Sequence, residues 1–117
     1  MARSVTLYGI PNCDTVKKAR AWLDAQGVAY TFHDFKKQGL DAALARNWLA
    51  ALGTYTLINR KGTTWRALDD ARKALAAQPA GALTLVTEQP TLIKRPVLDR
   101  DGALSVGFSP ATYAKYF

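Results

Sequence analysis

Cysteine is nearly absent from this sequence, since Cys13 is the only one in 117 residues. A single cysteine cannot close an internal disulfide, which excludes a disulfide-stapled secreted scaffold. It cannot supply a cysteine-rich zinc or iron–sulfur site either, so we expect no metal centre. A lone thiol fits a reducing compartment, and we therefore expect a cytoplasmic protein.

Long hydrophobic runs are also missing. No apolar stretch approaches the ~20 residues that a membrane helix needs. The opening segment, MARSVTLYGIPNC, lacks the apolar region and small-residue cleavage site of a signal peptide. Hydrophobic residues still make up 49% of the chain, enough for one core. We expect a single domain over residues 1–117, without membrane association and most simply a monomer.

Acidic residues are the scarcer charge, 9 against 16 lysines and arginines, which gives a net charge of +7. A basic surface favours anionic partners. The two signs are interspersed, however, and no base-stacking or base-reading motif is present, so nucleic acid is an unlikely partner. We take most of these charges as a solvated surface and look for function only where basic residues flank a plausible site.

The hydrophobic pattern predicts an α/β protein. Residues 4–9 and 28–32 are expected strands on either side of a helix over 14–26 that buries Val16, Ala19 and Leu23. The end of the chain predicts a hairpin around Asp101-Gly102, with strands at 97–98 and 104–108, and a helix capped by Ser109-Pro110. Strand–helix–strand, helical insert and strand–strand–helix together predict a thioredoxin-like fold: a four-stranded mixed sheet with an inserted helical region.

The insert itself is expected to hold helices. One carries Leu44, Trp48 and Leu52 and ends at Gly53, and residues 57–62 form a break. A second begins at Thr63 or Thr64, carries Trp65, Leu68 and Leu75, and ends at Pro79. We expect Trp65 to lie in the core. A shorter one covers residues 80–88.

Cys13 is the candidate nucleophile. It lies between the Gly9-Ile10-Pro11-Asn12 loop and a predicted helix start, where free backbone N–H groups and the helix dipole stabilise a thiolate. Lys17, one turn later, adds positive potential. The alternative is an inert buried cysteine, but the polar neighbours Asn12 and Asp14 favour exposure. Because residue 16 is valine, there is no Cys-x-x-Cys motif, and an oxidised Cys13 needs an outside thiol such as glutathione.

Two basic segments are candidate binding sites. Arg95-Pro96 precedes a strand where a thioredoxin-like fold places a cis-proline beside its cysteine, and Arg95 would suit an oxyanion or carboxylate. Arg60 and Lys61 lie in a basic loop that leads into a helix. Taken alone, the Lys94-Arg95 pair is more simply a solvated surface pair before a strand. The Arg60-Lys61 loop is equally well a capped helix start with solvated charges. We assign no role to the lone His33.

The motifs YGIPNCDTVKKA, the basic segment before GTTWR, KRPV and VGFSPATY together resemble the arsenate reductase/Spx family over nearly the whole chain. The sequence is most similar to the small bacterial arsenate-reductase-like proteins proposed to be glutathione-dependent thiol reductases. The resemblance implies a cytoplasmic oxidoreductase with a redox-active cysteine and no tightly bound cofactor, and with glutathione as thiol co-substrate and glutaredoxin as a possible partner. It matches Cys13 to the catalytic cysteine, and Arg95 with Pro96 to a substrate-binding pair.

Two departures shape the expected function. The central arginine of the family maps near Arg60, with Lys61 competing for the register, and the last oxyanion arginine has no counterpart in residues 105–109. We therefore expect a glutathione-dependent thiol reductase. An arsenate reductase is the near alternative, and a non-catalytic Spx-like regulator that binds RNA polymerase is the alternative from another class.

Overall fold

The computed structural model describes residues 4–117, which form two compact units. Unit 1 joins the two ends of the chain, up to Phe35 and from Arg95 to Phe117. Unit 2 is the continuous segment Lys36–Lys94. The prediction of one domain over the whole chain stays a prediction, and we describe each unit by itself.

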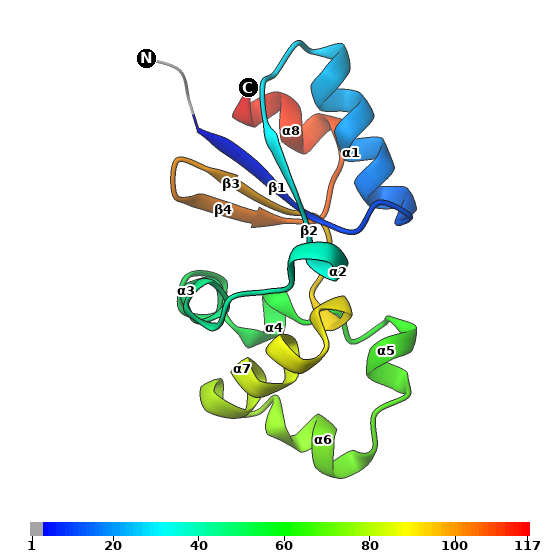
Figure 1. Cartoon of the computed structure of the whole chain (residues 1–117), viewed down its shortest axis with the longest axis vertical. Helices are drawn as coiled ribbons and strands as arrows, with labels where there is room; N and C mark the ends of the chain where they lie inside the picture. The colour runs from blue at the N-terminus through cyan, green and yellow to red at the C-terminus, as the bar shows by residue number, and fades with distance from the viewer. Residues whose placement is uncertain (1–3) are drawn as a thin grey trace. The chain divides into compact units, whose positions relative to one another are not determined.

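Unit 1 is built on a four-stranded sheet in the order β2-β1-β3-β4 (Figure 1). Its strands are β1 (Val5–Gly9), β2 (Thr31–Asp34), β3 (Val97–Arg100) and β4 (Ala103–Val106). β1 pairs in parallel with β2 and antiparallel with β3, which pairs antiparallel with β4. The sheet is therefore mixed, as the thioredoxin-like prediction requires.

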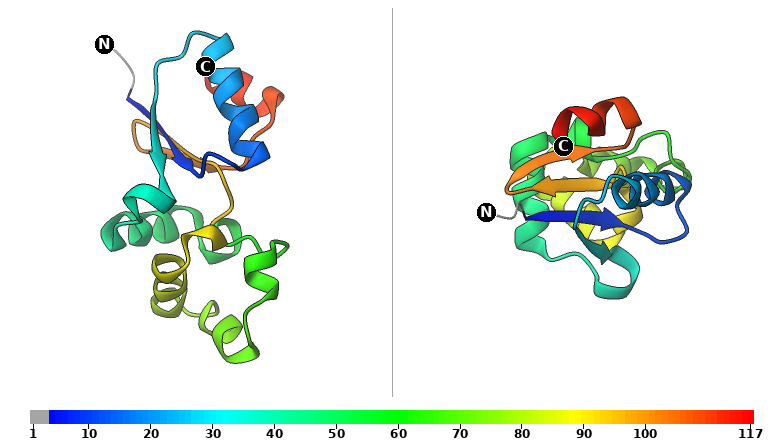
Figure 2. Two further views of the ribbon diagram at one scale, coloured as in Figure 1. Left: turned by 45° about the vertical axis from the view of Figure 1, so that its right-hand side comes forward. Right: turned by 90° about the horizontal axis from the view of Figure 1, so that it is seen from above.

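Two helices cover one face of this sheet, α1 (Asp14–Ala25) and α8 (Pro110–Tyr116) (Figures 1 and 2). The core between helices and sheet contains residues from both ends of the chain: Val5, Leu7, Ala19, Leu23, Leu98 and Tyr113. The predicted stripe Val16, Ala19 and Leu23 is fully buried. Ser109 caps α8 as predicted, with its Oγ accepting a hydrogen bond from Thr112 N at 3.1 Å.

The second strand begins later than predicted, at Thr31 instead of residue 28. Val28 donates its N–H to Leu23 O at 3.0 Å and so closes the turn that follows α1 instead of pairing with β1. The ladder with β1 begins only at the Thr6–Thr31 pair. Val28 and Tyr30 nevertheless pack on the core, which explains their apolar alternation without strand pairing. The predicted hairpin turn is confirmed, since β3 and β4 pair across Asp101 and Gly102, which both have positive φ, 52° and 94°. Its strands differ from the prediction: the first runs on to Arg100, and the second covers Ala103–Val106 instead of residues 104–108.

Unit 2 is helical. Phe35–Gln38 forms α2, which crosses the boundary between the units. The other helices are α3 (Ala42–Leu52), α4 (Thr54–Leu57), α5 (Thr63–Arg66), α6 (Asp70–Leu75), α7 (Pro79–Glu88) and the 3-10 turn η1 (Pro90–Leu92). A bridge between Ile58 and Ile93 ties the middle of the unit to its end. The helices bury Trp48, Leu57, Leu85, Val86, Leu92 and Ile93.

The helix predicted from Thr63 or Thr64 to Pro79 is wrong, because the chain forms two short helices there. Asp69 interrupts it: its Oδ1 accepts a hydrogen bond from Arg72 N at 2.8 Å, which caps a new helix, α6. Pro79 starts α7 at its first position and does not end the helix before it. The break predicted over residues 57–62 begins one residue late, since Leu57 is the last residue of α4.

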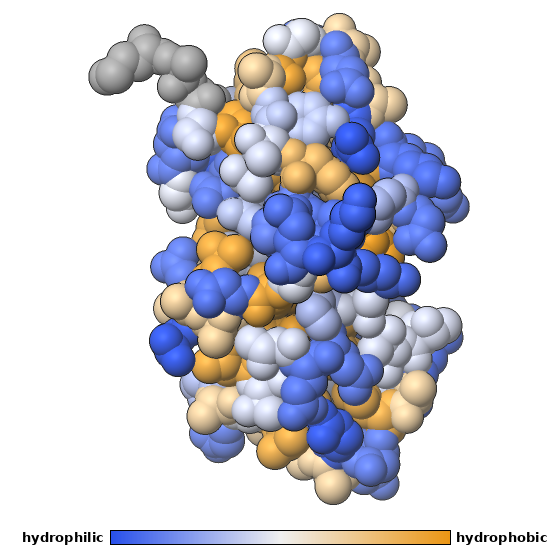
Figure 3. All heavy atoms as spheres, viewed as in Figure 1, coloured by the Kyte–Doolittle hydropathy of each residue, from blue (hydrophilic) through white to orange (hydrophobic). Residues whose placement is uncertain are grey.

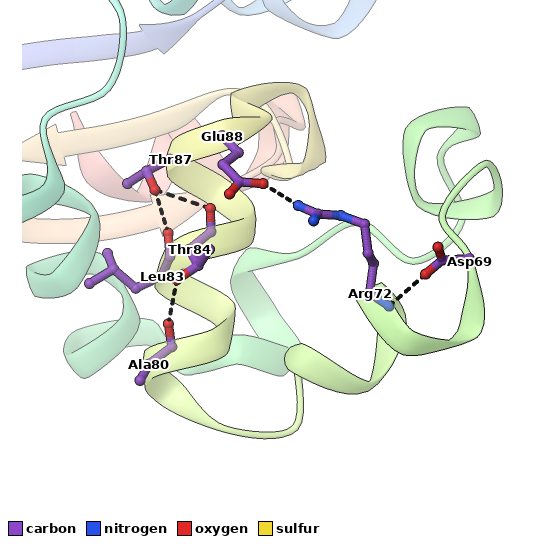
Figure 4. Close-up of polar contacts among 7 residues, drawn as sticks. All are labelled: Asp69, Arg72, Ala80, Leu83, Thr84, Thr87 and Glu88. Atoms are coloured by element: carbon purple, nitrogen blue, oxygen red, sulfur yellow. Dashed lines mark hydrogen bonds and ion pairs between the residues drawn. The ribbon is translucent and has the colours of Figure 1, made fainter.

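Polar contacts connect α6 and α7. Arg72 pairs with Glu88 by hydrogen bond and ion pair, while Thr84 and Thr87 donate their hydroxyls to carbonyls one turn earlier in α7 (Figure 4). Such exposed ion pairs each contribute little to the free energy of unfolding.

On the face shown in Figure 3, hydrophilic residues predominate and hydrophobic ones appear as separate patches. Of the helices in residues 4–117, none is long and apolar enough to span a bilayer.

Candidate functional site

The loop after β1 is held tightly against α1. At Gly9, a Cβ atom would lie 2.7 Å from Val16 Cγ2, closer than real Cβ atoms approach a neighbour. Gly9 and Ile10 are buried, whereas Pro11 and Asn12 are exposed. The chain therefore leaves the sheet at a fixed point and surfaces just before Cys13.

Cys13 is the N-cap residue of the 12-residue helix α1. Its backbone is extended (φ −91°, ψ 126°), and its carbonyl accepts the first helical hydrogen bond, from Lys17 N at 2.9 Å. The side chain makes no capping hydrogen bond and is half-buried. Cys13 is therefore partly exposed to solvent at the N-terminal end of α1.

Pro96 and Arg95 lie at the same end of the sheet as this loop. Val97 pairs with Tyr8 near the carboxyl end of β1, and Pro96 comes just before Val97 in the chain. Pro96 therefore lies beside the carboxyl end of β1. The Arg95–Pro96 peptide bond is cis, as the predicted thioredoxin-like fold suggested, and Pro96 is buried with its carbonyl accepting from Gly107 N at 2.9 Å. Arg95 is half-buried.

Tyr8 brings an aromatic cluster to the same unit. Its ring lies 5.0 Å from the His33 ring and 6.4 Å from the Phe35 ring. Burial, and then the charge of Asp99, raise the pKa of the Tyr8 hydroxyl above its ordinary value. His33, to which sequence analysis assigns no role, lies on β2 among these rings.

Arg60 and Lys61 belong to unit 2. The Arg60 guanidinium lies 4.7 Å from the centre of the Tyr55 ring and 5.3 Å from that of Trp65. Lys61 is exposed, and its backbone N–H donates to Asn59 Oδ1 at 3.1 Å. Trp65, predicted in the core, is only half-buried, and its ring contacts Arg60.

The structure thus brings Cys13, Arg95 and Pro96 into one unit and places Arg60 and Lys61 in the other. Sequence reasoning missed Tyr55 and Lys94, which line one pocket with Arg60 and Lys61. Nothing in the sequence spacing pointed to Tyr55, and Lys94 was interpreted only as half of a Lys-Arg pair on the surface. Residues 4–117 contain no group of three or more metal-ligating side chains.

Comparison with known proteins identifies the family. Residues 8–116 match the ArsC family. An uncharacterized protein of Haemophilus influenzae is 40% identical over 113 residues, 97% of this chain and 98% of the relative. The global transcriptional regulator Spx of Streptococcus pyogenes is 27% identical over 90% of this chain and 78% of its own length.

Two solved structures are similar over nearly the whole chain. A protein named YFFB is 51% identical, with a TM-score of 0.90 and coverage of 96% of this chain and 97% of that one. An arsenate reductase (ArsC) related protein from Brucella melitensis is 52% identical, with a TM-score of 0.78 and coverage of 97% and 94%. By sequence and by fold, this chain belongs to the ArsC family.

Proposed function

We propose that this ArsC-family protein is a glutathione-dependent thiol reductase with Cys13 as its nucleophile. The family includes relatives described as arsenate reductases and relatives described as Spx regulators, so membership alone supports an oxidoreductase only in general terms. The observation that carries the finer proposal is Cys13 itself: a half-buried N-cap thiol with no capping hydrogen bond, at the start of a 12-residue helix.

The chemistry follows from having only one cysteine. The Cys13 thiolate attacks a mixed disulfide between glutathione and a substrate thiol, forms the Cys13–glutathione disulfide and releases the substrate thiolate. A second glutathione thiolate then attacks that disulfide, releasing oxidised glutathione and restoring the Cys13 thiolate. Glutaredoxin is an alternative reductant for this second step. Neither step needs a resident cofactor, and both suit a cytoplasmic glutathione pool.

The binding residues proposed for this reaction are Arg95, Pro96, Arg60 and Lys61. Glutathione carries two carboxylates, which guanidinium groups bind in a planar, two-pronged way. Arg95 is the first candidate because it shares a unit with Cys13. Pro96 shapes the backbone beside it.

Arsenate reduction is a weaker candidate because no arginine occupies residues 105–109. We expect weak or absent turnover of arsenate with glutathione and glutaredoxin. Rates in the ordinary enzyme range, roughly 1–10³ per second, would contradict this. The Spx-like alternative rests on the sequence similarity to Spx proteins. Val16 argues against it, since the disulfide switch common in those regulators needs a second cysteine there.

Mass spectrometry of the intact protein tests the proposal. After treatment with oxidised glutathione, we expect one added glutathione on Cys13, and its removal by excess reduced glutathione. Cys13→Ser is the matched control and should gain no adduct. A wild-type protein that forms no adduct, or that copurifies with RNA polymerase and has no thiol turnover, would favour the regulator.

A further inference from the structure

A pocket of about 390 Å³ lies entirely within unit 2. It is lined by Tyr55, Thr56, Ile58, Asn59, Arg60, Lys61 and Lys94. Among these lining residues, Arg60, Lys61 and Lys94 are cationic and none is acidic. Its volume falls in the range of small-molecule sites.

Backbone hydrogen bonds fix the position of Lys94 relative to the Arg60 loop. Lys94 N donates to Leu57 O at 2.7 Å, and Asn59 N donates to Leu92 O at 2.8 Å, on either side of the Ile58–Ile93 bridge. Two segments far apart in sequence are thus joined as a short ladder. These hydrogen bonds place Lys94 at the same pocket as Arg60, although the two residues are far apart in sequence.

The loop that carries Arg60 and Lys61 is also ordered by its own contacts. Asn59 Oδ1 accepts the Lys61 N–H, and Asn59 O accepts the Gly62 N–H at 3.4 Å. A Cβ at Gly62 would lie 3.0 Å from Asn59 Nδ2, so the turn is closely packed. The cations are therefore presented from a defined backbone.

The Arg60 guanidinium makes cation–π contacts with the rings of Tyr55 and Trp65. Tyr55 lies on α4 with its side chain 84% exposed, and its ring faces the Arg60 guanidinium. A guanidinium stacked on rings keeps the N–H groups at its edge available for an anion. Three like charges around one pocket repel each other, and an anionic ligand would relieve that repulsion.

We propose that Lys94, Arg60 and Lys61 form a binding pocket for a small molecule that carries a carboxylate or phosphate group, with Tyr55 positioning Arg60. For its biological ligand this pocket rests on the proposed function, where a glutathione carboxylate is the obvious occupant. The pocket itself does not involve Cys13. The proposal adds Lys94 as a residue that binds the anion and Tyr55 as a residue that positions Arg60. Sequence analysis predicted neither role.

The test uses the full chain with Cys13→Ser, so that no disulfide forms. Inorganic phosphate and S-methylglutathione are titrated separately while amide and indole resonances are followed by NMR. Both arms should shift resonances of residues 55–61, Lys94 and the Trp65 indole. Tighter binding of S-methylglutathione identifies the peptide carboxylate as the ligand group, and tighter binding of phosphate identifies a phosphate ester.

Matched variants separate the pocket from general basic charge. Lys94→Ala should weaken binding roughly tenfold, as loss of one charge-assisted hydrogen bond does. Lys115→Ala removes the same charge from an exposed position on α8 and should leave affinity unchanged. Tyr55→Ala should weaken binding, whereas Tyr55→Phe keeps the ring and should restore it.

Equal affinities for Lys94→Ala and Lys115→Ala, or no shifts at the lining residues with either probe, would overturn the pocket. Failure of the proposed function has a different signature. If wild-type Cys13 forms no glutathione adduct while the Cys13→Ser protein binds the probes, the thiol reductase is wrong and the pocket stands.

Discussion

Arg95 is the side chain that most directly tests substrate binding at the Cys13 end of unit 1. Arg95→Ala removes both its charge and its planar fork, and should cost about 1.5–3 kcal/mol in apparent glutathione binding, the range for a charged hydrogen bond. Arg95→Lys keeps only the charge and should fall between alanine and wild type. Calorimetric titration with glutathione measures both.

Stability provides the control for these variants. Arg95 is half-buried and absent from the core. The free energy of unfolding of both variants, measured in urea, should therefore stay close to that of wild type. Unchanged glutathione affinity in Arg95→Ala would remove Arg95 from the binding residues. It would return the Lys94-Arg95 pair to the simpler interpretation, a basic segment before a strand.

Tyr113 gives a pH-dependent prediction. It is fully buried, and its hydroxyl has no hydrogen-bond partner within residues 4–117. Burial, with a smaller contribution from Tyr116, raises the pKa of Tyr113 well above its ordinary value. Unfolded tyrosine ionises near pH 10, while the folded state keeps the proton. This stabilisation is complete below about pH 10 and is lost as pH rises further.

The comparison is Tyr113→Phe, which keeps the ring and removes the ionisable group. At neutral pH its free energy of unfolding should equal or exceed that of wild type, because no hydrogen bond is lost. Above about pH 10 the wild type should lose more stability than the variant. Parallel stability curves for the two proteins between pH 8 and 11 (a range set about the tyrosine pKa) would contradict this.

At the scale of elements, the junction of β1 and α1 sets the position of Cys13. Gly9→Ala places a Cβ against the buried, β-branched Val16, which has little rotamer freedom to move away. We expect a loss of about 1–3 kcal/mol in the free energy of unfolding, the usual cost of overpacking. Alkylation of Cys13 should change in rate, because the helix start must shift. Urea unfolding and iodoacetamide kinetics measure the two effects.

A second substitution checks that mechanism. Val16→Ala removes the methyl groups that the new Cβ would meet. In that background Gly9→Ala should cost clearly less than in wild type, so the two changes should be non-additive. Additive losses would mean that Gly9 is needed for another reason, such as its backbone conformation.

The elements that were predicted well are those whose ends are fixed by local chemistry. Ser109-Pro110 opens α8 and Asp101-Gly102 turns the hairpin, because capping and positive φ are properties of those residues themselves. The start of β2 depends on where β1 offers a partner, which no local pattern near Val28 contains. Asp69 was overlooked as a cap because the apolar spacing of Trp65, Leu68 and Leu75 ran through it.

The candidate site shows the same division. Cys13 was predictable because a loop ending in polar residues before an amphipathic stretch marks a helix start. The cis bond before Pro96 was predictable only through the expected thioredoxin-like fold, since most X-Pro bonds are trans. Lys94 is brought to Arg60 by backbone hydrogen bonds between residues 57–59 and 92–94, and Tyr55 meets Arg60 through its ring; sequence spacing indicates neither contact.

At the scale of the whole molecule, the two ends of the chain stabilise each other. Tyr113, on the last helix, packs with Val5 and Leu7 of β1, Leu98 of β3 and the buried face of α1. Tyr113→Ala should cost about 3–5 kcal/mol, the usual loss for a buried aromatic ring, out of a typical total of about 5–15 kcal/mol. Amides of β1 and β3 should then exchange hydrogen faster, although Tyr113 is distant in sequence from β1. Hydrogen-exchange mass spectrometry measures this, with α3 and α7 of unit 2 as internal reference. Unaltered exchange in β1 would mean that the N-terminal strand, and with it the position of Cys13, does not depend on the C-terminal helix.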